Sequence, residues 1–346
     1  MKVLVTGGAG FIGANIAEYL HKKGYEITVI DNLSRETAVK NKKYLEKNYP
    51  EIKIIQGDVR NFELIKEIVK NKDCIIHCAA QVAATTSIKN PLEDLEVNIL
   101  GTFNLLEAAR KYCEKPIFIY FSTNKVYGNN VNKIPLIELE TRYDFAHSEF
   151  KGKGIPETFS TDSNAHTPYG VSKYAGELYV RDYACNFGIK GIANRCSCMY
   201  GRLQYGTEDQ GWLAHFIIST LLKKPITIYG NGKQVRDILY VDDVVKLVEL
   251  QIEKADEISG EAFNIGGAYE NTISLLELLE ELKNKTELPE IKFSHWRPAD
   301  QKVYYSDITK ARNLLGWKPE INKKEGISKL YEWLRETLIY ENTSYM

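Results

Sequence analysis

The stretch Thr6-Gly7-Gly8-Ala9-Gly10-Phe11-Ile12-Gly13 decides the fold class of this 346-residue chain. It follows an apolar run that predicts a strand and opens an amphipathic run that predicts a helix. Gly7 permits a tight turn, Gly10 lets the backbone approach a pyrophosphate, and Gly13 lets the helix pack on the strand. The first helical turn, which holds Phe11 and Ile12, offers backbone N–H groups and partial positive charge to phosphates. The stretch therefore predicts a cradle for a dinucleotide.

The first half of the chain alternates nearly continuous apolar runs with amphipathic stretches. Strands are expected over Lys2–Thr6, Glu26–Ile30, Lys53–Gln56, Cys74–Cys78, Pro116–Ser122 and Gly191–Arg195, and helices over Phe11–Lys23, Phe62–Lys70, Pro91–Tyr112 and Tyr169–Phe187. Strands that are apolar throughout are typical of sheets buried on both faces. Their alternation with helices predicts an α/β fold with a doubly wound parallel sheet, the Rossmann arrangement.

Two regions interrupt this alternation. Residues 128–168 are polar and aperiodic, and a loop of that length in a compact protein is usually functional. Residues 201–232 and 266–318 carry arginines, aromatic residues and short helical patterns but few expected strands. We therefore expect an NAD-binding Rossmann domain formed by residues 1–196 plus 237–265. A smaller α/β substrate-binding domain is expected from residues 197–236 plus 266–346.

The charges of the chain balance, with 45 Lys plus Arg against 46 Asp plus Glu. This gives no electrostatic footprint for nucleic acid or an anionic membrane. No apolar run approaches the roughly 20 residues that a membrane span requires. The six cysteines show no paired metal-type spacing, and no metal is expected. With free thiols and no export signal, the sequence indicates a cytoplasmic protein whose partner is a small molecule.

Asp31 ends the second expected strand. A carboxylate there can accept both ribose hydroxyls of an adenosine and would repel a 2′-phosphate, which favours NAD over NADP as the cofactor. Asn32 and Ser34 follow in the same loop and are expected beside the cofactor. Arg35 can accommodate an extra phosphate or be a solvated charge at a helix start, and both interpretations stay open at this point.

Tyr169 and Lys173 stand four residues apart, on one face of an expected helix. A tyrosine has a reference pKa of about 10, so a phenolate near neutral pH must be stabilised by roughly 4 kcal/mol. A lysine ammonium beside the ring and the positive nicotinamide of NAD can supply that stabilisation. Such pairs are common on helix surfaces, but after a dinucleotide cradle this one predicts acid–base chemistry coupled to hydride transfer.

Motifs along nearly the whole chain resemble the extended short-chain dehydrogenases/reductases that modify nucleotide sugars. They are the glycine cradle, Gly57-Asp58-Val59-Arg60, His77-Cys78-Ala79-Ala80, Asn98-x-x-Gly101-Thr102, Tyr169-x-x-x-Lys173, Arg236-Asp237-x-x-Tyr240-Val241-x-Asp243 and Arg297-Pro298-x-Asp300. The resemblance implies that the cofactor is held by Asp58 and Val59 at the adenine and by Ala79, Ala80, Gln81 and Asn98 along its path. It also implies that Thr123 completes the catalytic set with Tyr169 and Lys173.

The segment Thr123-Asn124-Lys125-Val126-Tyr127-Gly128 narrows the reaction. The 4,6-dehydratases of this family carry Asp-Glu where Asn124 and Lys125 stand, and an amide and an ammonium cannot replace carboxylates that move protons during loss of water. Together with the run from Ser197 to Trp212, the segment most resembles the family's carbon-2 epimerases for CDP-linked sugars. Those epimerases carry Ser, and the 4-epimerases Asn, where this chain has Cys198.

The resemblance implies NAD-dependent epimerisation of a nucleotide-diphosphate sugar, at carbon 2 of a CDP-hexose of the paratose, tyvelose or glucose type, through a 2-keto intermediate. Arg236 and Arg297 match family positions that grip the diphosphate, and their geometry suits bidentate phosphate contacts. The other residues expected at the substrate are Thr123, Asn124, Cys198, Arg202, Gln204, Tyr205 and Gln210. His77 is expected to be a packed strand histidine rather than a catalytic base.

Several alternatives stay open on the sequence. They are a UDP-sugar 4-epimerase, an NAD(P)-dependent nucleotide-sugar dehydratase or reductase, and, outside the enzymes, a non-catalytic NAD-binding sensor. The presence of Thr123, Tyr169 and Lys173 together argues against the sensor. The expected apolar helices Pro91–Tyr112 and Tyr169–Phe187 resemble the pair through which family members dimerise, so a homodimer or homotetramer is expected.

Overall fold

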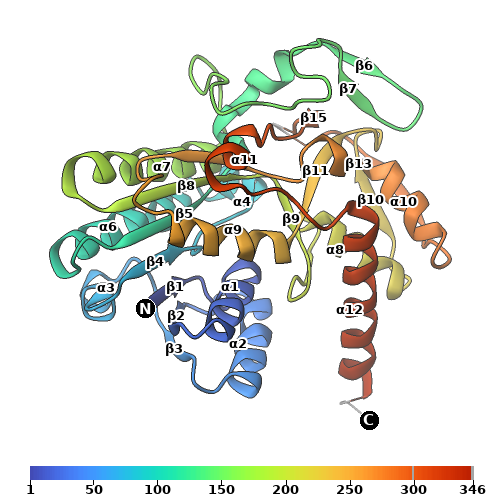
Figure 1. Ribbon diagram of the computed structural model, residues 1–346. Coiled ribbons are helices and arrows are strands. Elements are labelled where there is room, and N and C mark those ends of the chain that lie inside the picture. Colours follow the sequence, from blue (N-terminus) through green and yellow to red (C-terminus); the bar gives the residue numbers. More distant parts are fainter. Residues whose placement is uncertain (298–299, 344–346) are drawn as a thin grey trace.

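The computed structural model describes residues 1–297 and 300–343 (Figure 1). Pro298 of the Arg297-Pro298-x-Asp300 motif and residues 344–346 of the expected second domain lie outside the described residues. Within the described part of the chain, no helix is both long and apolar enough to span a membrane.

A seven-stranded parallel sheet forms the centre of the larger part of the molecule, in the order β12-β8-β5-β4-β1-β2-β3. Its strands are β1 (Lys2–Thr6), β2 (Glu26–Asp31), β3 (Lys53–Gln56), β4 (Cys74–His77), β5 (Ile117–Thr123), β8 (Lys190–Cys196) and β12 (Ala262–Ile265). The order reverses direction at β1, as in a doubly wound sheet. The fold predicted from the sequence is confirmed, and six of these strands lie within one or two residues of their predicted bounds.

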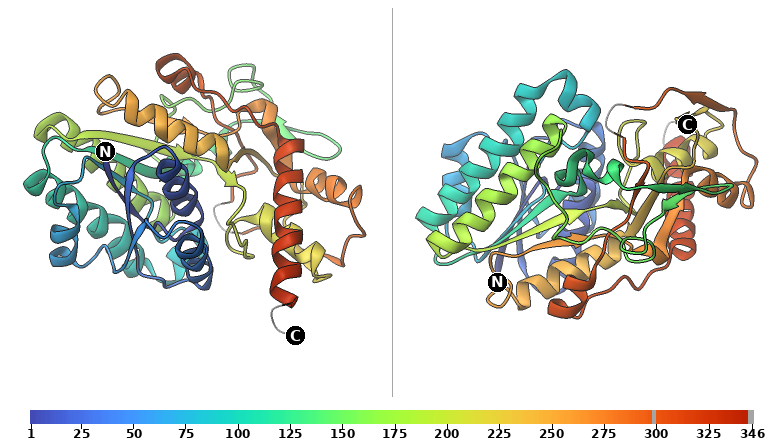
Figure 2. Two further views of the ribbon diagram at one scale, coloured as in Figure 1. Left: turned by 60° about the horizontal axis from the view of Figure 1, so that its bottom comes forward. Right: turned by 90° about the horizontal axis from the view of Figure 1, so that it is seen from above.

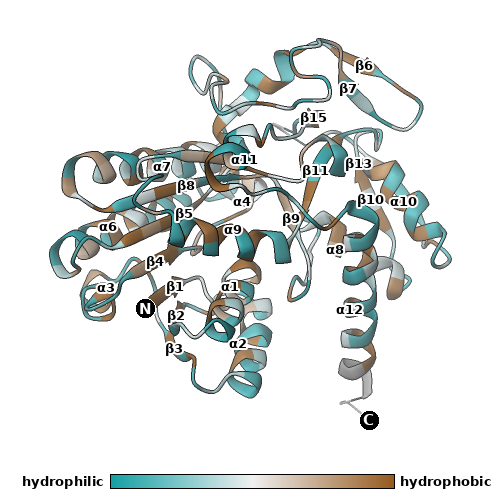
Figure 3. Cartoon of the chain, viewed as in Figure 1, coloured by the Kyte–Doolittle hydropathy of each residue, from teal (hydrophilic) through white to brown (hydrophobic). Residues whose placement is uncertain are grey.

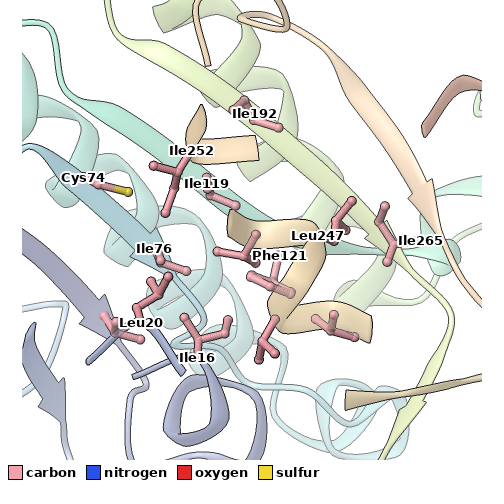
Figure 4. Packing of buried hydrophobic residues seen from close by; sticks show 14 of the residues in the cluster. Ile16, Leu20, Cys74, Ile76, Ile119, Phe121, Ile192, Leu247, Ile252 and Ile265 are labelled. Carbon is pink, nitrogen blue, oxygen red and sulfur yellow. The ribbon is translucent and has the colours of Figure 1, made fainter. Parts of the chain in front are cut away.

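Helices cover both faces of this sheet (Figures 1 and 2). One layer consists of α1 (Phe11–Lys22), α2 (Glu36–Asn48) and α9 (Val241–Glu253), and the other of α3 (Phe62–Val69), α6 (Gly101–Tyr112) and α7 (Pro168–Phe187). Alternate strand residues point to opposite faces, so Val3 and Val5 join the core beneath α1 and α9, whereas Leu4 joins the core beneath the second layer. Figure 4 shows the first core, where Ile16 of α1 and Leu247 of α9 meet Phe121 of β5.

The expected helix over Pro91–Tyr112 is interrupted by one wider turn. It begins as α5 (Pro91–Leu95), passes through a π-helical turn, η1 (Glu96–Leu100), and continues as α6. The wider turn carries Asn98, which is 1% exposed. Single π turns inside α-helices often occur at functional sites, and no periodicity in the sequence marks this one.

The smaller part contains more strands than the sequence predicts. A four-stranded sheet joins β9 (Cys198–Tyr200), β11 (Val235–Tyr240), β13 (Thr272–Ser274) and β15 (Val303–Tyr304), and β10 (Ile226–Tyr229) pairs with β14 (Ile291–Ser294). Beside them lie α8 (Trp212–Leu221), α10 (Leu275–Lys283) and α12 (Lys323–Thr343) (Figure 2). β11 belongs to this smaller sheet, whereas α9 and β12, which follow it along the chain, return to the large one.

The polar region 128–168 is folded rather than an open loop. It contains the end of η2 (Asn124–Lys133), a hairpin formed by β6 (Leu136–Glu138) and β7 (Tyr143–Phe145), and turns and bends over residues 146–167 before α7 (Figure 1). Arg142 in the hairpin turn forms an ion pair with Glu277 of α10. Figure 3 shows that the hairpin mixes hydrophilic and hydrophobic residues, unlike the strands of the central sheet. Tyr143 of β7 donates its backbone N–H to the carbonyl of Lys233, just before β11, and β7 contacts β15, so the hairpin docks onto the smaller part.

Candidate active site

The glycine cradle has the close approaches that its sequence requires. Gly7 has a φ of +62°, and a Cβ on it would lie 2.6 Å from the backbone nitrogen of Ala79. A Cβ on Gly13 would lie 2.3 Å from the carbonyl oxygen of Gly7. Gly10 caps α1 without a side-chain hydrogen bond, and the first turn of this helix contains no acidic residue. The first turn of α1 thus has no acidic side chain of its own that would compete with a pyrophosphate at this helix end.

Asp31 lies at the carboxyl end of β2, against the cradle. Its Oδ2 accepts a hydrogen bond of 3.1 Å from the backbone of Ala9, and its Oδ1 accepts one of 2.9 Å from Leu33. Burial raises the pKa of this carboxyl, while the backbone donors act in the opposite direction. The acid therefore stands where the sequence placed it, one loop away from the phosphate cradle. Its position fits the ribose of an adenosine.

A chain of polar contacts surrounds the expected adenine position. Asn32 donates to Oδ2 of Asp58 over 3.0 Å, and Arg60 forms an ion pair with the same carboxylate at 2.8 Å. The Arg60 guanidinium holds the pKa of Asp58 well below its usual range. Ser34 donates its backbone N–H to Oδ1 of Asn32, which orders the loop after β2. Val59, next to Asp58, is buried.

Gln81 and Asn98 form one buried network behind the cofactor path. The backbone N–H of Gln81 donates to Oδ1 of Asn98 over 2.9 Å, and Nδ2 of Asn98 donates back to the carbonyl of Gln81 over 3.0 Å. Asn98 also donates to Ser172 Oγ on α7 over 3.0 Å. These bonds fix the segment that includes Ala79 and Ala80 relative to the helix that carries Tyr169 and Lys173.

Thr123, Tyr169 and Lys173 come together at the carboxyl end of β5. Thr123 ends that strand, Tyr169 lies in the first turn of α7, and Lys173 lies one turn further on, with its Nζ 4.2 Å from the ring centre of Tyr120. Burial raises the pKa of Tyr169 to about 12, while a hydrogen bond with Thr123 lowers it. Burial also lowers the pKa of Lys173 to about 8. The sequence predicts a Tyr169 pKa below the usual value of about 10, because a nearby ammonium stabilises the phenolate. With the described residues alone, burial has the larger effect and the pKa is raised instead.

A cavity of about 430 Å³ opens beside these three residues and extends into the smaller part. It brings together most of the predicted substrate residues, namely Thr123, Asn124, Cys198, Gln204, Gln210, Arg236 and Arg297, with Phe11, Ile12 and Ala80 from the cofactor set. The cavity lies at the carboxyl ends of the large sheet's strands, where doubly wound folds bind ligands.

Two cations face this cavity from the smaller part. Nη2 of Arg236 forms an ion pair with Asp300 at 2.7 Å. Arg297 stacks over the ring of Tyr229 at 3.9 Å and donates two hydrogen bonds of 3.1 Å to the carbonyl of Glu208. Both guanidinium groups are part-buried and lie in the cavity wall. Guanidinium groups bind phosphate bidentately, so two of them in one cavity wall suit a diphosphate.

The segment 207–211 crosses between the two parts of the molecule above the cavity. Arg35 of the large part donates to the side-chain oxygen of Gln210, and Thr85 donates to Asp209 over 3.1 Å. On the other side, Tyr229 donates to Glu208 over 2.6 Å. We call residues 207–211 the strap. The side chain of Arg35, expected at the cofactor, thus points across to the strap.

A family model described as GDP-mannose 4,6 dehydratase matches residues 4–330. The chain belongs to this family of extended short-chain dehydrogenases/reductases. This confirms the family that the motifs predict. Membership agrees with the fold, because the matched region contains the large sheet except for the first two residues of β1, and all of the residues gathered at the cavity.

Three relatives illustrate the range of the family. The chain is 41% identical over 342 residues to a CDP-paratose 2-epimerase of Salmonella typhi, covering 96% of this chain and 99% of that protein. A solved UDP-glucose 4-epimerase of Thermotoga maritima, with UDP-glucose, superposes with a TM-score of 0.83 at 32% identity, covering 98% and 100% of the two chains. A UDP-glucuronic acid 4-epimerase of Bacillus cereus, in complex with UDP-glucuronic acid and NAD, has a TM-score of 0.82 at 28% identity, covering 97% and 100%.

Some predicted site residues lie away from the cavity wall. Arg202 forms an ion pair of 2.6 Å with Glu18 on α1, and the ring of Tyr205 packs edge-on against Trp333. Neither residue lines the cavity, and their expected contact with the substrate stays a prediction. His77 is fully buried between Thr6 and Thr102, at 2.7 and 2.9 Å, and burial lowers its pKa well below the usual value. The expectation that His77 is a packed strand residue is confirmed.

The cavity wall also contains residues that the sequence did not single out as substrate contacts. Lys125, Gln234, Trp212 and Asp300 are the main ones. Burial raises the pKa of Cys198, and a hydrogen bond with Trp212 lowers it, so the thiol and the indole lie together in the wall. Trp212 and Asp300 belong to family motifs in the sequence, so their place at the site could have been predicted. Gln234 lies two residues before Arg236, outside any such motif, and nothing in the sequence marks it.

The lowered pKa of Lys173 predicts a pH dependence of stability. Between the folded-state value of about 8 and the usual 10.5, the unfolded chain binds more protons, so this residue's contribution to the free energy of unfolding rises with pH. Lys173→Met should remove this rise, which amounts to at most about 3 kcal/mol. Urea unfolding at several pH values in that window measures it. The control is Lys133→Met, at an exposed position. If the difference in the free energy of unfolding between the wild type and Lys173→Met stayed constant with pH, the lowered pKa of Lys173 would be contradicted.

Proposed function

We propose that the protein is an NAD-dependent epimerase that inverts carbon 2 of a nucleotide-diphosphate hexose, with CDP as the nucleotide. The observation that carries the proposal is the meeting of Thr123, Tyr169 and Lys173 with Arg236 and Arg297 around one cavity. The high identity to a CDP-paratose 2-epimerase over 96% of the chain supports carbon 2 and CDP. The amide and ammonium of Asn124 and Lys125, in place of two carboxylates, argue against a dehydratase.

The cofactor in this proposal is held by the cradle and by Asp31. Bound there, NAD would accept a hydride from the sugar carbon and give it back. Tyr169, as the phenolate that the positive charges of Lys173 and of bound NAD would favour against the effect of burial, takes the proton of the reacting hydroxyl at its Oη and later returns it, while Thr123 hydrogen-bonds the same oxygen. Lys173, buried beside Tyr120, supplies positive charge on the cofactor side. Arg236 and Arg297 hold the diphosphate while the keto sugar presents its other face.

The division of labour follows the two parts of the molecule. We propose that residues 1–196 with 237–265 bind NAD, and that residues 197–236 with 266–346 bind the nucleotide sugar. Residues 237–240 are an exception to this division: they belong to β11, which lies in the smaller sheet, and so they support the sugar side of the site. We also propose a cytoplasmic location, which suits six cysteines that are all free thiols.

The decisive experiment is to incubate the purified protein with CDP-glucose, CDP-paratose and UDP-glucose in deuterated water and to identify the products by NMR. We expect inversion at carbon 2 of a CDP-sugar, without deuterium at that carbon, because the hydride returns directly. Inversion of UDP-glucose at carbon 4 would replace the proposal by a UDP-sugar 4-epimerase. Loss of water from the sugar would indicate a dehydratase. No turnover together with NAD binding would indicate a sensor.

We propose that the protein is a homodimer through α6 and α7. These neighbouring helices, with η1 before α6, expose large apolar side chains, namely Leu100, Phe103, Leu178, Tyr179 and Phe187, which are 36 to 48% exposed. Apolar patches of this kind mark protein–protein contacts. Tyr179→Glu should shift the sedimentation mass from two chains to one. The control is Phe293→Glu, at a 62% exposed position on β14, and a Tyr179→Glu protein that stays dimeric would contradict the surface.

A further inference from the structure

Lys125 stands between the reacting residues and the diphosphate cations. It lies at the start of η2, directly after β5, and its backbone N–H donates to Oγ1 of Thr123 over 3.2 Å. Its side chain is part-buried in the cavity wall. The mechanism above gives this ammonium no task.

Gln301 orients the Lys125 side chain. Nζ of Lys125 lies 3.5 Å from Oε1 of Gln301, and the same oxygen accepts a 3.2 Å hydrogen bond from Nδ2 of Asn124. Gln301 is only 1% exposed. Its Nε2 has no hydrogen-bond partner among the described residues. A buried N–H group without a partner costs about 1–3 kcal/mol. The orientation in which Oε1 of Gln301 faces Asn124 and Lys125 therefore comes at a cost in stability.

The surroundings of Lys125 make it a strong donor for anionic oxygen. Burial and the nearby positive charge of Arg236 lower its pKa to about 8, while Asp300 acts in the opposite direction. Below that pH the ammonium carries its charge in a poorly solvated place, where a hydrogen bond to an anionic oxygen is stronger than in water. The carboxylate of Asp300 lies near both cations: it forms the ion pair with Arg236 and also acts on the charge of Lys125. The two cations Lys125 and Arg236 against the one carboxylate of Asp300 therefore leave a positive charge at this part of the wall.

We propose that Lys125 selects carbon 2 as the reacting carbon, by binding the sugar-side phosphate and the oxygen on carbon 2 with one ammonium. The phosphate is attached through carbon 1, so its oxygens and the oxygen on carbon 2 are neighbours in the substrate. The oxygen on carbon 4 lies across the ring and cannot share this contact. With Lys125 joined to Thr123 through its backbone, the shared contact brings carbon 2 to Thr123 and Tyr169.

This role rests on the proposed function and adds a requirement to it. Hydride loss at carbon 2 and proton transfer to Tyr169 leave a keto group whose oxygen keeps the contact with Lys125. The Lys125 contact and the two arginines then hold the sugar nucleotide while its other face turns toward the site. If the keto sugar escaped, the enzyme would be left in its reduced form. Gln301 is a positioning residue here, because it acts through Lys125.

A binding cycle tests the contact without relying on turnover. In a Tyr169→Phe background, the dissociation constants of a CDP-hexose and of its 2-deoxy and 4-deoxy analogues are measured by calorimetry with and without Lys125→Met. We expect Lys125→Met to weaken the parent and the 4-deoxy analogue by about tenfold or more. The 2-deoxy analogue should lose clearly less, because half of the contact is already absent. Equal losses for all three ligands would overturn the assignment.

Turnover gives a second measurement. We expect Lys125→Met to lower kcat by about 100-fold and to build up reduced cofactor, seen by its absorbance, as keto sugar escapes. Gln301→Leu should show the same build-up to a smaller extent, whereas Lys133→Met, on the same η2 segment but outside this cavity, should behave as wild type. Wild-type kinetics for Lys125→Met would overturn the role. Failure of the wild-type protein to invert carbon 2 would instead overturn the proposed function, so the two failures are distinguishable.

Discussion

Tyr169→Phe is expected to reduce turnover by about 1,000-fold or more while leaving the cofactor bound. The substitution removes the hydroxyl that exchanges a proton with the sugar in the proposed mechanism, and general acid–base groups of this kind contribute about 100- to 10,000-fold. The ring itself stays in the first turn of α7, so the packing against the cavity is preserved. Steady-state kinetics with the nucleotide sugar that the wild-type protein converts measures the loss. Cofactor content after gel filtration measures retention of NAD.

Tyr174→Phe provides the matched control on the same helix. The hydroxyl of Tyr174 accepts a 2.9 Å hydrogen bond from Thr161 and lies outside the cavity wall. Its removal deletes a tyrosine hydroxyl of α7 without touching the reacting atoms, so kcat should stay within about twofold of wild type, a difference of under 0.5 kcal/mol in barrier. A Tyr169→Phe protein as active as the Tyr174→Phe control would remove Tyr169 from the mechanism.

Gly13→Val is expected to abolish cofactor binding and to destabilise the fold. Even the first side-chain carbon would lie 2.3 Å from the carbonyl oxygen of Gly7 and 2.6 Å from Cα of Gly8. Backbone atoms cannot rotate away as a flexible side chain can, so α1 must move off β1. Overpacking of this kind costs about 1–3 kcal/mol. Urea unfolding measures the stability loss, and titration with NAD, followed by tyrosine and tryptophan fluorescence, measures binding.

Gly188→Asn serves as the control for glycine loss in general. Gly188 ends α7 with a φ of +72°, and nothing lies within 4 Å of a Cβ built there. Asparagine tolerates this left-handed conformation, so the variant should bind NAD as wild type and lose at most about 1 kcal/mol. If Gly13→Val bound NAD with unchanged affinity, the cradle would not be the pyrophosphate site.

The large sheet was predictable because each of its strands carries a local signal. β1, β4 and β5 are continuous apolar runs, and the helices between them have a period that marks their buried face. The smaller sheet was not predictable in the same way. β15 is two residues long and β13 three, and each becomes a strand only through pairing with β11, which is distant in the sequence.

The site residues show the same difference between local and tertiary signals. The cradle, Asp31 and the shared helix face of Tyr169 and Lys173 could be predicted because turns and helix faces are local, although the Tyr–Lys pair is informative only together with the cradle. The direction of a long side chain is decided by tertiary neighbours, and two arginines show this. Arg202 turns toward Glu18, whose carboxylate is buried on α1, whereas Arg236 pairs with Asp300 at the cavity. Gln301 was missed for the same reason, since only the folded chain brings it to Asn124 and Lys125.

The strap over the cavity bears on how long a nucleotide resides in the protein. Arg297 donates to the carbonyl of Glu208, and the strap carboxylates of Glu208 and Asp209 lie 3.9 and 3.7 Å from its guanidinium. If Arg297 binds the diphosphate as proposed, the incoming diphosphate competes with these carboxylates for the same cation, and part of its attraction is offset by the contact it displaces. Dissociation is assisted for the same reason, because the strap carboxylates pair with Arg297 again as the phosphate leaves. Such an exchange trades tight binding for quick release, which favours rapid cycling over storage of the ligand.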